Sequence, residues 1–131
     1  MGKINILSAA LVALAALAGS TRALLEPAFK LGEIYSFPNP ARGSQKPTVH
    51  VEVGLADSVT IEFMDIAGQK LGNATLNGQP GIIDDGKGAE YAYEYTWDTS
   101  TLGSGSYLAA VTAHKAGYSD LQAVSKIAVL K

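Results

Sequence analysis

Alternation of apolar and polar residues is the sequence feature that most limits how this chain can fold. In PTVHVEV (residues 47–53), valine occupies every second position from 49 to 53, and the residues between are polar. The segment SVTIEF (residues 58–63) repeats the pattern. Successive side chains of an extended strand point to opposite faces, so each segment predicts a β-strand with one buried and one exposed face.

Short segments of this kind continue from Glu33 to Lys131, separated by Gly, Pro, Asn and Asp, and no helical period follows residue 30. We therefore expect residues 33–131 to form an all-β domain, an immunoglobulin-like antiparallel β-sandwich of about seven strands. The alternation slips out of phase at Met64–Ile66, which predicts a β-bulge. The segment from Gln79 to Ala89 is expected to be a loop. The last segment, LQAVSKIAVLK, is expected to be a strand that completes the core.

The first 23 residues differ from the rest. An apolar run over residues 4–18 follows Lys3, and small-residue motifs of the kind that precede signal-peptide cleavage occur at residues 16–18 and 21–23. This is the organisation of a secretory signal peptide, and the run is shorter than the roughly 20 residues that cross a bilayer. The alternative is a retained hydrophobic helix, because one face would present Ile4, Leu7, Leu11, Leu14 and Ala18. Residues 24–32 are expected to be a linker.

Composition excludes several classes of function. The chain has no cysteine, so disulfides, thiolate metal sites, a cysteine nucleophile and a lipoprotein anchor are excluded. After residue 23 acidic groups outnumber basic ones and no basic stripe occurs, which argues against nucleic acid as a partner. We expect contact with a membrane only through residues 4–18, and only if they are retained.

Three motifs and a final strand ending in lysine resemble a known family. The motifs are YSFPNPARG at 35–43, VTIEFMDIAGQKL at 59–71 and YTWDTSTLGSGSYLAAVTA at 95–113. From about Glu33 to Lys131 the chain resembles the immunoglobulin-like C-terminal modules of secreted bacterial proteins. These are the type IX secretion sorting domains and the similar domain of the flagellar hook-capping protein. The resemblance implies a surface, including Lys126 and Lys131, that is read during export or assembly.

Four aromatic residues lie on one face of the expected strand YAYEYTW. They are Tyr91, Tyr93, Tyr95 and Trp97. The opposite face holds Ala92, Glu94 and Thr96, which suit solvent, so we expect the rings to face the core and the outermost ring, Tyr91, to protrude. The alternative is a platform on which a carbohydrate stacks. Tyr107 is expected to join the same core, with its hydroxyl bonded to backbone at a strand corner.

The segment GIIDDGKGAE gathers three acidic residues among glycines, Asp84, Asp85 and Glu90. Carboxylate oxygens bind hard cations, which makes the segment a weak calcium candidate, but the spacing does not match a calcium-binding hand. We favour the interpretation that the aspartates shape a turn by bonding their own backbone.

Catalytic residues are not evident. His50 and His114 are expected to be solvated surface residues without a third zinc ligand, and Glu52, Glu62 and Glu94 to be solvated carboxylates. The serines of GSGS (residues 103–106) lack the context of a nucleophile elbow. We expect no enzyme activity, no cofactor and no resident metal.

These observations favour an exported, non-catalytic module, secreted or at the cell surface, that acts as a structural or assembly subunit. Its expected partners are proteins, either further copies that could form a filament or an export machine. A secretion-sorting module and a carbohydrate-binding module are the alternatives. Lys126 and Lys131 are expected to point to solvent and to keep a strand edge from pairing indiscriminately.

Overall fold

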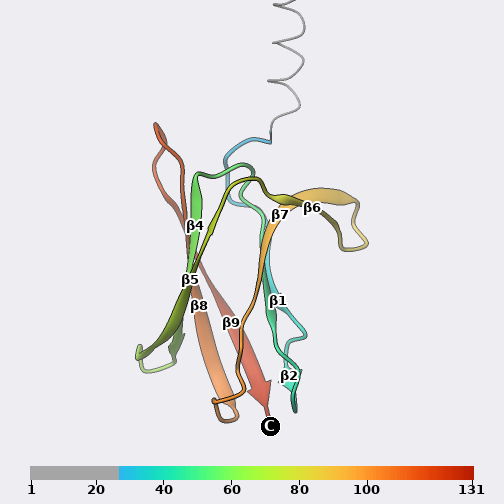
Figure 1. Cartoon of the computed structure of the whole chain (residues 1–131), viewed down its shortest axis with the longest axis vertical. Coiled ribbons are helices and arrows are strands. Elements are labelled where there is room, and N and C mark those ends of the chain that lie inside the picture. The colour runs from blue at the N-terminus through green and yellow to red at the C-terminus, as the bar shows by residue number, and fades with distance from the viewer. Residues whose placement is uncertain (1–26) are drawn as a thin grey trace, which may run out of the picture.

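The computed structural model describes residues 27–131, which form two β-sheets and no helix (Figure 1). The sheet orders are β1-β3-β7-β6 and β2-β9-β8-β4-β5. The strands are β1 (Ile34–Phe37), β2 (Ala41–Arg42), β3 (Thr48–Val51), β4 (Ser58–Asp65), β5 (Lys70–Asn77), β6 (Gly81–Asp84), β7 (Ala89–Thr96), β8 (Gly105–His114) and β9 (Leu121–Leu130). The signal peptide or helix expected over residues 1–23 lies outside the described residues.

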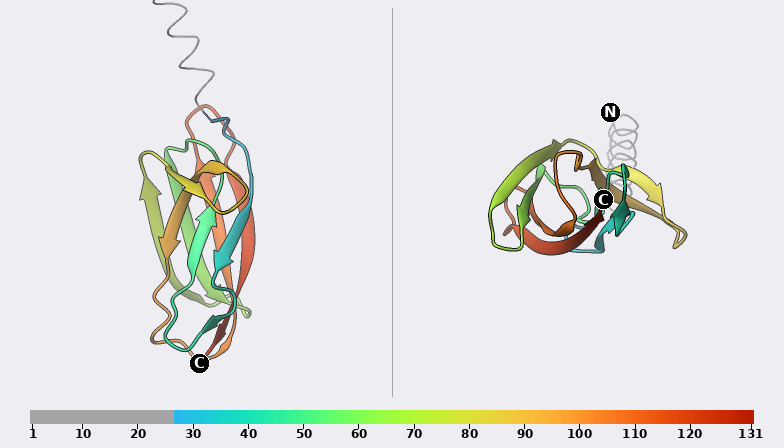
Figure 2. Two further views of the ribbon diagram at one scale, coloured as in Figure 1. Left: turned by 90° about the vertical axis from the view of Figure 1, so that its right-hand side faces the viewer. Right: turned by 90° about the horizontal axis from the view of Figure 1, so that it is seen from below.

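The two sheets face each other as a β-sandwich, which confirms that part of the prediction (Figure 2). All pairs of neighbouring strands are antiparallel except β2 and β9, which run parallel. The described residues contain nine strands where about seven were expected. The additional strands are β2, which has only two residues, and β6, which lies inside the loop expected over residues 79–89. Within residues 27–131 no helix is present that could span a membrane.

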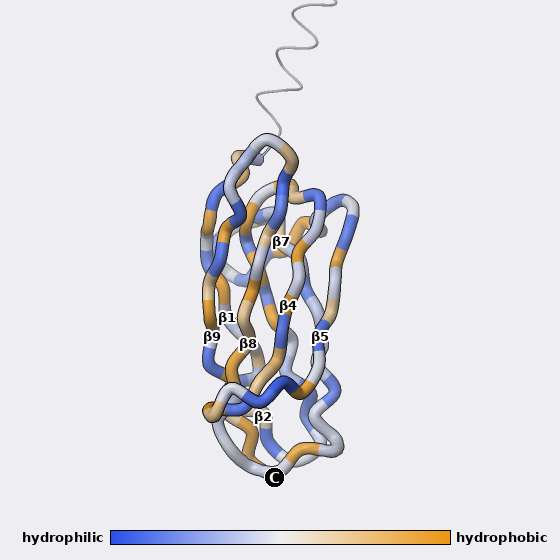
Figure 3. Tube along the Cα trace, turned by 90° about the vertical axis from the view of Figure 1, so that its left-hand side faces the viewer, coloured by the Kyte–Doolittle hydropathy of each residue, from blue (hydrophilic) through white to orange (hydrophobic). Residues whose placement is uncertain are grey.

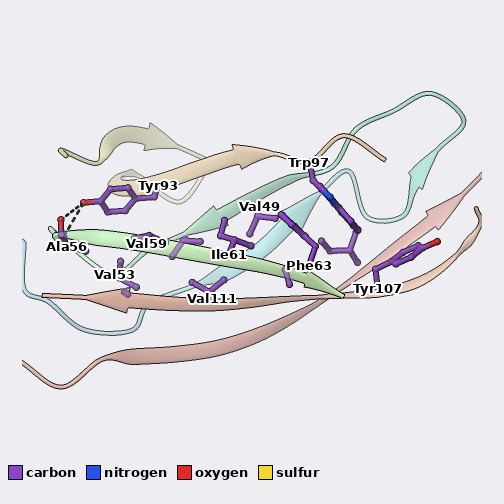
Figure 4. Packing of buried hydrophobic residues seen from close by; sticks show 14 of the residues in the cluster. Val49, Val53, Ala56, Val59, Ile61, Phe63, Tyr93, Trp97, Tyr107 and Val111 are labelled. Carbon is purple, nitrogen blue, oxygen red and sulfur yellow. Dashed lines mark hydrogen bonds between the residues drawn. The ribbon is translucent and has the colours of Figure 1, made fainter. Parts of the chain in front are cut away.

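The core between the sheets follows the alternation of the sequence, which appears as alternating hydropathy along β4 in Figure 3. Every inward residue of β4 is at most 1% exposed. The register between β4 and β5 shifts between Phe63 and Met64, next to the predicted bulge, but the additional residue is Leu71 of β5, and β4 pairs with β8 without interruption as far as Asp65. The valines and isoleucines of the core are Val49, Val51, Val53, Val59, Ile61, Val111, Ile127 and Val129 (Figure 4).

Aromatic rings close the two ends of this core. Trp97 is 6% exposed and stacks on Phe63 with ring centroids 4.2 Å apart, while the ring of Tyr107 meets its indole edge-on at 5.6 Å. Tyr93 is also buried, and Figure 4 shows its hydroxyl beside Ala56. The core prediction is therefore confirmed for Trp97 and Tyr93. Tyr95 is half-buried, and Tyr91 is 40% exposed, as expected for the outermost ring.

Two tyrosine hydroxyls tie loops to this core. The Tyr93 hydroxyl accepts a hydrogen bond from the Ala56 N–H at 3.1 Å and donates to the Gly78 carbonyl at 2.8 Å. It thereby joins the β3–β4 connection to the β5–β6 connection. The Tyr107 hydroxyl donates to the Gly103 carbonyl at 2.7 Å, which confirms the expected bond at a strand corner.

The end of β9 is paired on both sides. On one side lies β8, and on the other β2 pairs Ala41 with Val129 (Figure 2). Just before β2, the side-chain amide of Asn39 donates to the Lys126 carbonyl and accepts from the Ala128 N–H, both at 2.9 Å. The side-chain amide therefore makes the two hydrogen bonds to β9 that the backbone of a neighbouring strand would otherwise make.

Candidate functional site

The outer face of the four-stranded sheet carries a row of polar side chains. The strand register places Tyr35 of β1 opposite His50 of β3, and His50 opposite Glu94 of β7. Glu52 lies two residues beyond His50, on the same face of the chain. Three neighbouring strands therefore bring an imidazole, a phenol and two carboxylates together.

This face is covered, which corrects the sequence-based interpretation. His50 is 1% exposed and Glu52 is 8% exposed, so neither is the solvated surface residue that was expected. For His50 the reason is the ring of Tyr35, which stacks on the imidazole with centroids 4.5 Å apart and planes inclined by 21°. Ala92, also expected to face solvent, is buried as well, and it pairs with Gly81 of β6.

Both ring nitrogens of His50 face carboxylates. Nδ1 lies 2.8 Å from Oε2 of Glu94, and Nε2 lies 3.0 Å from Oε2 of Glu52. A neutral imidazole has a single N–H and therefore donates to one of the two carboxylates, while its other nitrogen offers a lone pair. The buried ring is thus held in a fixed orientation between two acidic groups.

A third carboxylate comes from the turn between β6 and β7. The hydroxyl of Tyr35 donates to Oδ2 of Asp85 at 2.8 Å, across 50 residues of sequence. The backbone N–H of Lys87 donates to Oδ1 of Asp85 at 3.2 Å. As a result, one ligand atom from each of His50, Glu52 and Asp85 lies within 4.8 Å of the other two.

The electrostatic environment of the cluster is negative. Burial, the bond to Asp85 and the charges of Asp85, Glu94 and Glu33 raise the pKa of Tyr35 to about 12. The same hydroxyl, together with the N–H of Lys87, holds the pKa of Asp85 below its usual value. Around neutral pH the phenol therefore keeps its proton, and Asp85 stays ionised.

Two surface hollows adjoin the Tyr35–Asp85 contact. The first, about 550 Å³, is lined by Glu33, Ile34, Tyr35, Asp85 and Lys87. The second, about 390 Å³, is lined by Tyr35, Phe37, Ile83, Asp84, Asp85 and Glu94. Tyr35 and Asp85 line both hollows, whereas His50 and Glu52 line neither and lie beneath them in the sheet.

The three calcium candidates do not form one group. Oδ1 of Asp84 accepts from the Gly86 N–H at 2.9 Å, and Asp85 accepts from Lys87, so the aspartates shape the turn as we favoured. Glu90 lies on β7 opposite Ile83. Within residues 27–131 the structure brings Asp85 to His50 and Glu52 instead.

The remaining residues singled out from the sequence lie elsewhere. His114 is exposed, as expected, with Nδ1 2.8 Å from Oδ1 of Asp120. Lys126 is also exposed. Lys131 is exposed but anchored, because its ammonium donates to the Thr99 carbonyl at 2.9 Å and its backbone N–H donates to Oγ of Ser104 at 2.8 Å.

A second surface of interest is the outer edge of β5. This eight-residue strand ends the five-stranded sheet and pairs with β4 alone. Its one charged residue is Lys70, at the end that adjoins the bulge, where the ammonium lies 2.9 Å from Oε1 of Glu62. From Leu71 to Asn77 the edge has neither a charged residue nor a proline.

Comparison with known proteins shows little similarity. No family model matches the chain, and no curated protein matches it. A solved structure that resembles it is that of CopC from Methylosinus trichosporium OB3b. The match has 14% sequence identity, covers 75% of this chain and 94% of that chain, and has a TM-score of 0.42. A similarity at this level supports no argument about function.

Proposed function

We propose that this protein is an exported, non-catalytic, immunoglobulin-like module that assembles with copies of itself at the cell surface or outside the cell. The observation that supports the proposal is the free edge of β5. Such an edge presents a row of unpaired backbone N–H and C=O groups that can bind another strand.

The other edge strands are less suited to pairing. Natural proteins protect sheet edges with short strands, charges, prolines or bulges. In the described part of the chain β1, β2 and β6 have four, two and four residues, and the Asn39 amide occupies backbone groups of β9 next to β2. On β5 the protective features are confined to Lys70 and the neighbouring bulge, so residues 71–77 remain able to pair.

A second copy of this chain fits the edge by its chemistry. In an antiparallel β5–β5 pair centred on Ala74, Asn73 of one copy would face Thr75 of the other. Every side chain from Leu71 to Asn77 is neutral, so no like charges would oppose each other. The arrangement is isologous and would join two five-stranded sheets into one continuous sheet.

Lysines placed on this edge should abolish the assembly. Asn73 and Thr75 are exposed, so Asn73→Lys with Thr75→Lys should preserve the fold and place lysines opposite each other across the pair. We expect the size of the purified parent protein to increase with concentration in sedimentation velocity, and the variant to stay monomeric.

The matched control adds the same charge in exposed turns, as Ser44→Lys with Ser119→Lys. This control should assemble like the parent. A parent that remains monomeric at every concentration would contradict the proposal, as would a control that dissociates as fully as the edge variant.

Export rests on the sequence of residues 1–23. We predict that the mature protein begins between Gly19 and Leu24, because these positions follow the two small-residue motifs. N-terminal sequencing or intact mass measurement of the exported protein tests this. A mature chain that keeps residues 4–18 would contradict it and would favour assembly through a packed hydrophobic helix.

A further inference from the structure

We propose that His50, Glu52 and Asp85 bind a divalent transition-metal ion of the Zn²⁺ type, through one imidazole nitrogen and two carboxylates. The inference concerns the outer face of the four-stranded sheet, whereas the proposed assembly uses the edge of the other sheet. A negative result for one proposal would therefore leave the other unaffected.

The orientation of His50 is the first argument. Glu94 lies 2.8 Å from Nδ1, where it can accept the ring N–H, and this leaves the lone pair of Nε2 directed toward Glu52. Carboxylates commonly hold metal-binding histidines in this way, because the bond fixes both the tautomer and the ring orientation. The stacked ring of Tyr35 restrains the imidazole further.

The spacing of the ligand atoms is the second argument. With metal–ligand bonds of about 2.0–2.2 Å, two ligands of one ion lie roughly 3 Å apart. Nε2 of His50 and Oε2 of Glu52 are already 3.0 Å apart, so both atoms could bind one ion with little movement. Asp85 lies within 4.8 Å of both, in an exposed turn, so a carboxylate oxygen of Asp85 would need to move closer by at most about 2 Å.

Charge and ligand type define the ion. Three carboxylates, those of Glu52, Asp85 and Glu94, surround a single imidazole, and the ammonium of Lys87 is paired with Glu33 at 2.8 Å. The excess of negative charge favours a cation. A buried imidazole nitrogen as ligand favours Zn²⁺ and similar ions over Ca²⁺ and Mg²⁺, which take oxygen ligands.

Calorimetric titration of the chelator-treated, purified protein with zinc chloride tests the proposal. We expect one Zn²⁺ ion per chain and no matching site for Ca²⁺ under the same conditions. Asp85→Asn should weaken zinc binding at least tenfold, because it removes a charged ligand. Asp84→Asn is the matched control, since it makes the same change one residue earlier in the same turn and should alter the affinity by less than twofold.

A further pair of variants distinguishes zinc binding at this site from zinc binding by the exposed histidine. Glu52→Gln keeps the shape of a buried ligand and should also weaken binding at least tenfold, with circular dichroism verifying the fold. His114→Ala removes the exposed histidine beside Asp120 and should leave binding unchanged. The proposal is overturned if the parent binds no zinc, if Asp84→Asn weakens binding as much as Asp85→Asn, or if His114→Ala abolishes it.

Discussion

Trp97→Ala should lower the free energy of unfolding by about 3 to 5 kcal/mol, the usual range for deleting a large buried aromatic side chain. The indole, which follows β7, is 6% exposed and packs against Phe63 of β4 and Tyr107 of β8, so its removal leaves a cavity between the two sheets. Denaturant titration of both proteins measures the difference.

Tyr91→Ala is the matched control for Trp97→Ala. Tyr91 belongs to the same aromatic segment but is 40% exposed, so its replacement should change the free energy of unfolding by less than about 1 kcal/mol. Equal midpoints for Trp97→Ala and the parent would show that the indole does not stabilise the core.

Deletion of β9 should unfold the domain. Ending the chain after Asp120 removes Ile127 and Val129, both fully buried, and separates β2 from β8 within the five-stranded sheet. The remaining β8 would expose a second long edge beside an open core, a state that the stability of a small domain cannot support. We expect the truncated chain to show no cooperative thermal transition in circular dichroism.

Substitution of Lys126 on β9 and of Lys131 just after it tests whether the exposed lysines have a role apart from the contribution of β9 to the core. Lys126→Ala with Lys131→Ala changes exposed side chains and should leave the melting temperature within a few degrees. A truncated chain that still unfolds cooperatively near the parent's melting temperature would contradict the role assigned to β9. If the lysine variant is exported and assembled like the parent, the lysines have no part in either process.

Much of the fold could be predicted because its strands obey one physical rule. Val49, Val51 and Val53 alternate with polar residues, and burial of one face follows directly from that pattern. The same holds for β4, whereas the additional residue of the neighbouring bulge lies in β5. The short strands β2 and β6 could not be found in this way, since two to four residues that pair mainly through backbone leave too little periodicity.

At the candidate site the alternation of apolar and polar residues was not enough to predict burial. Alternation correctly placed His50 and Glu52 on the face away from the core, but it does not say whether other side chains cover that face. The cover comes from Tyr35 of β1, which the register sets beside His50, and from the Asp85 turn. The signal available in the sequence was the His-Val-Glu segment (residues 50–52), which puts two possible ligands on one face of a strand.

The position of β9 also has a consequence for the order in which the protein is made. Of the nine described strands β9 is synthesised last, yet it lies between β2 and β8 and supplies Ile127 and Val129 to the core. The domain therefore cannot complete its fold until residues 121–130 have left the ribosome.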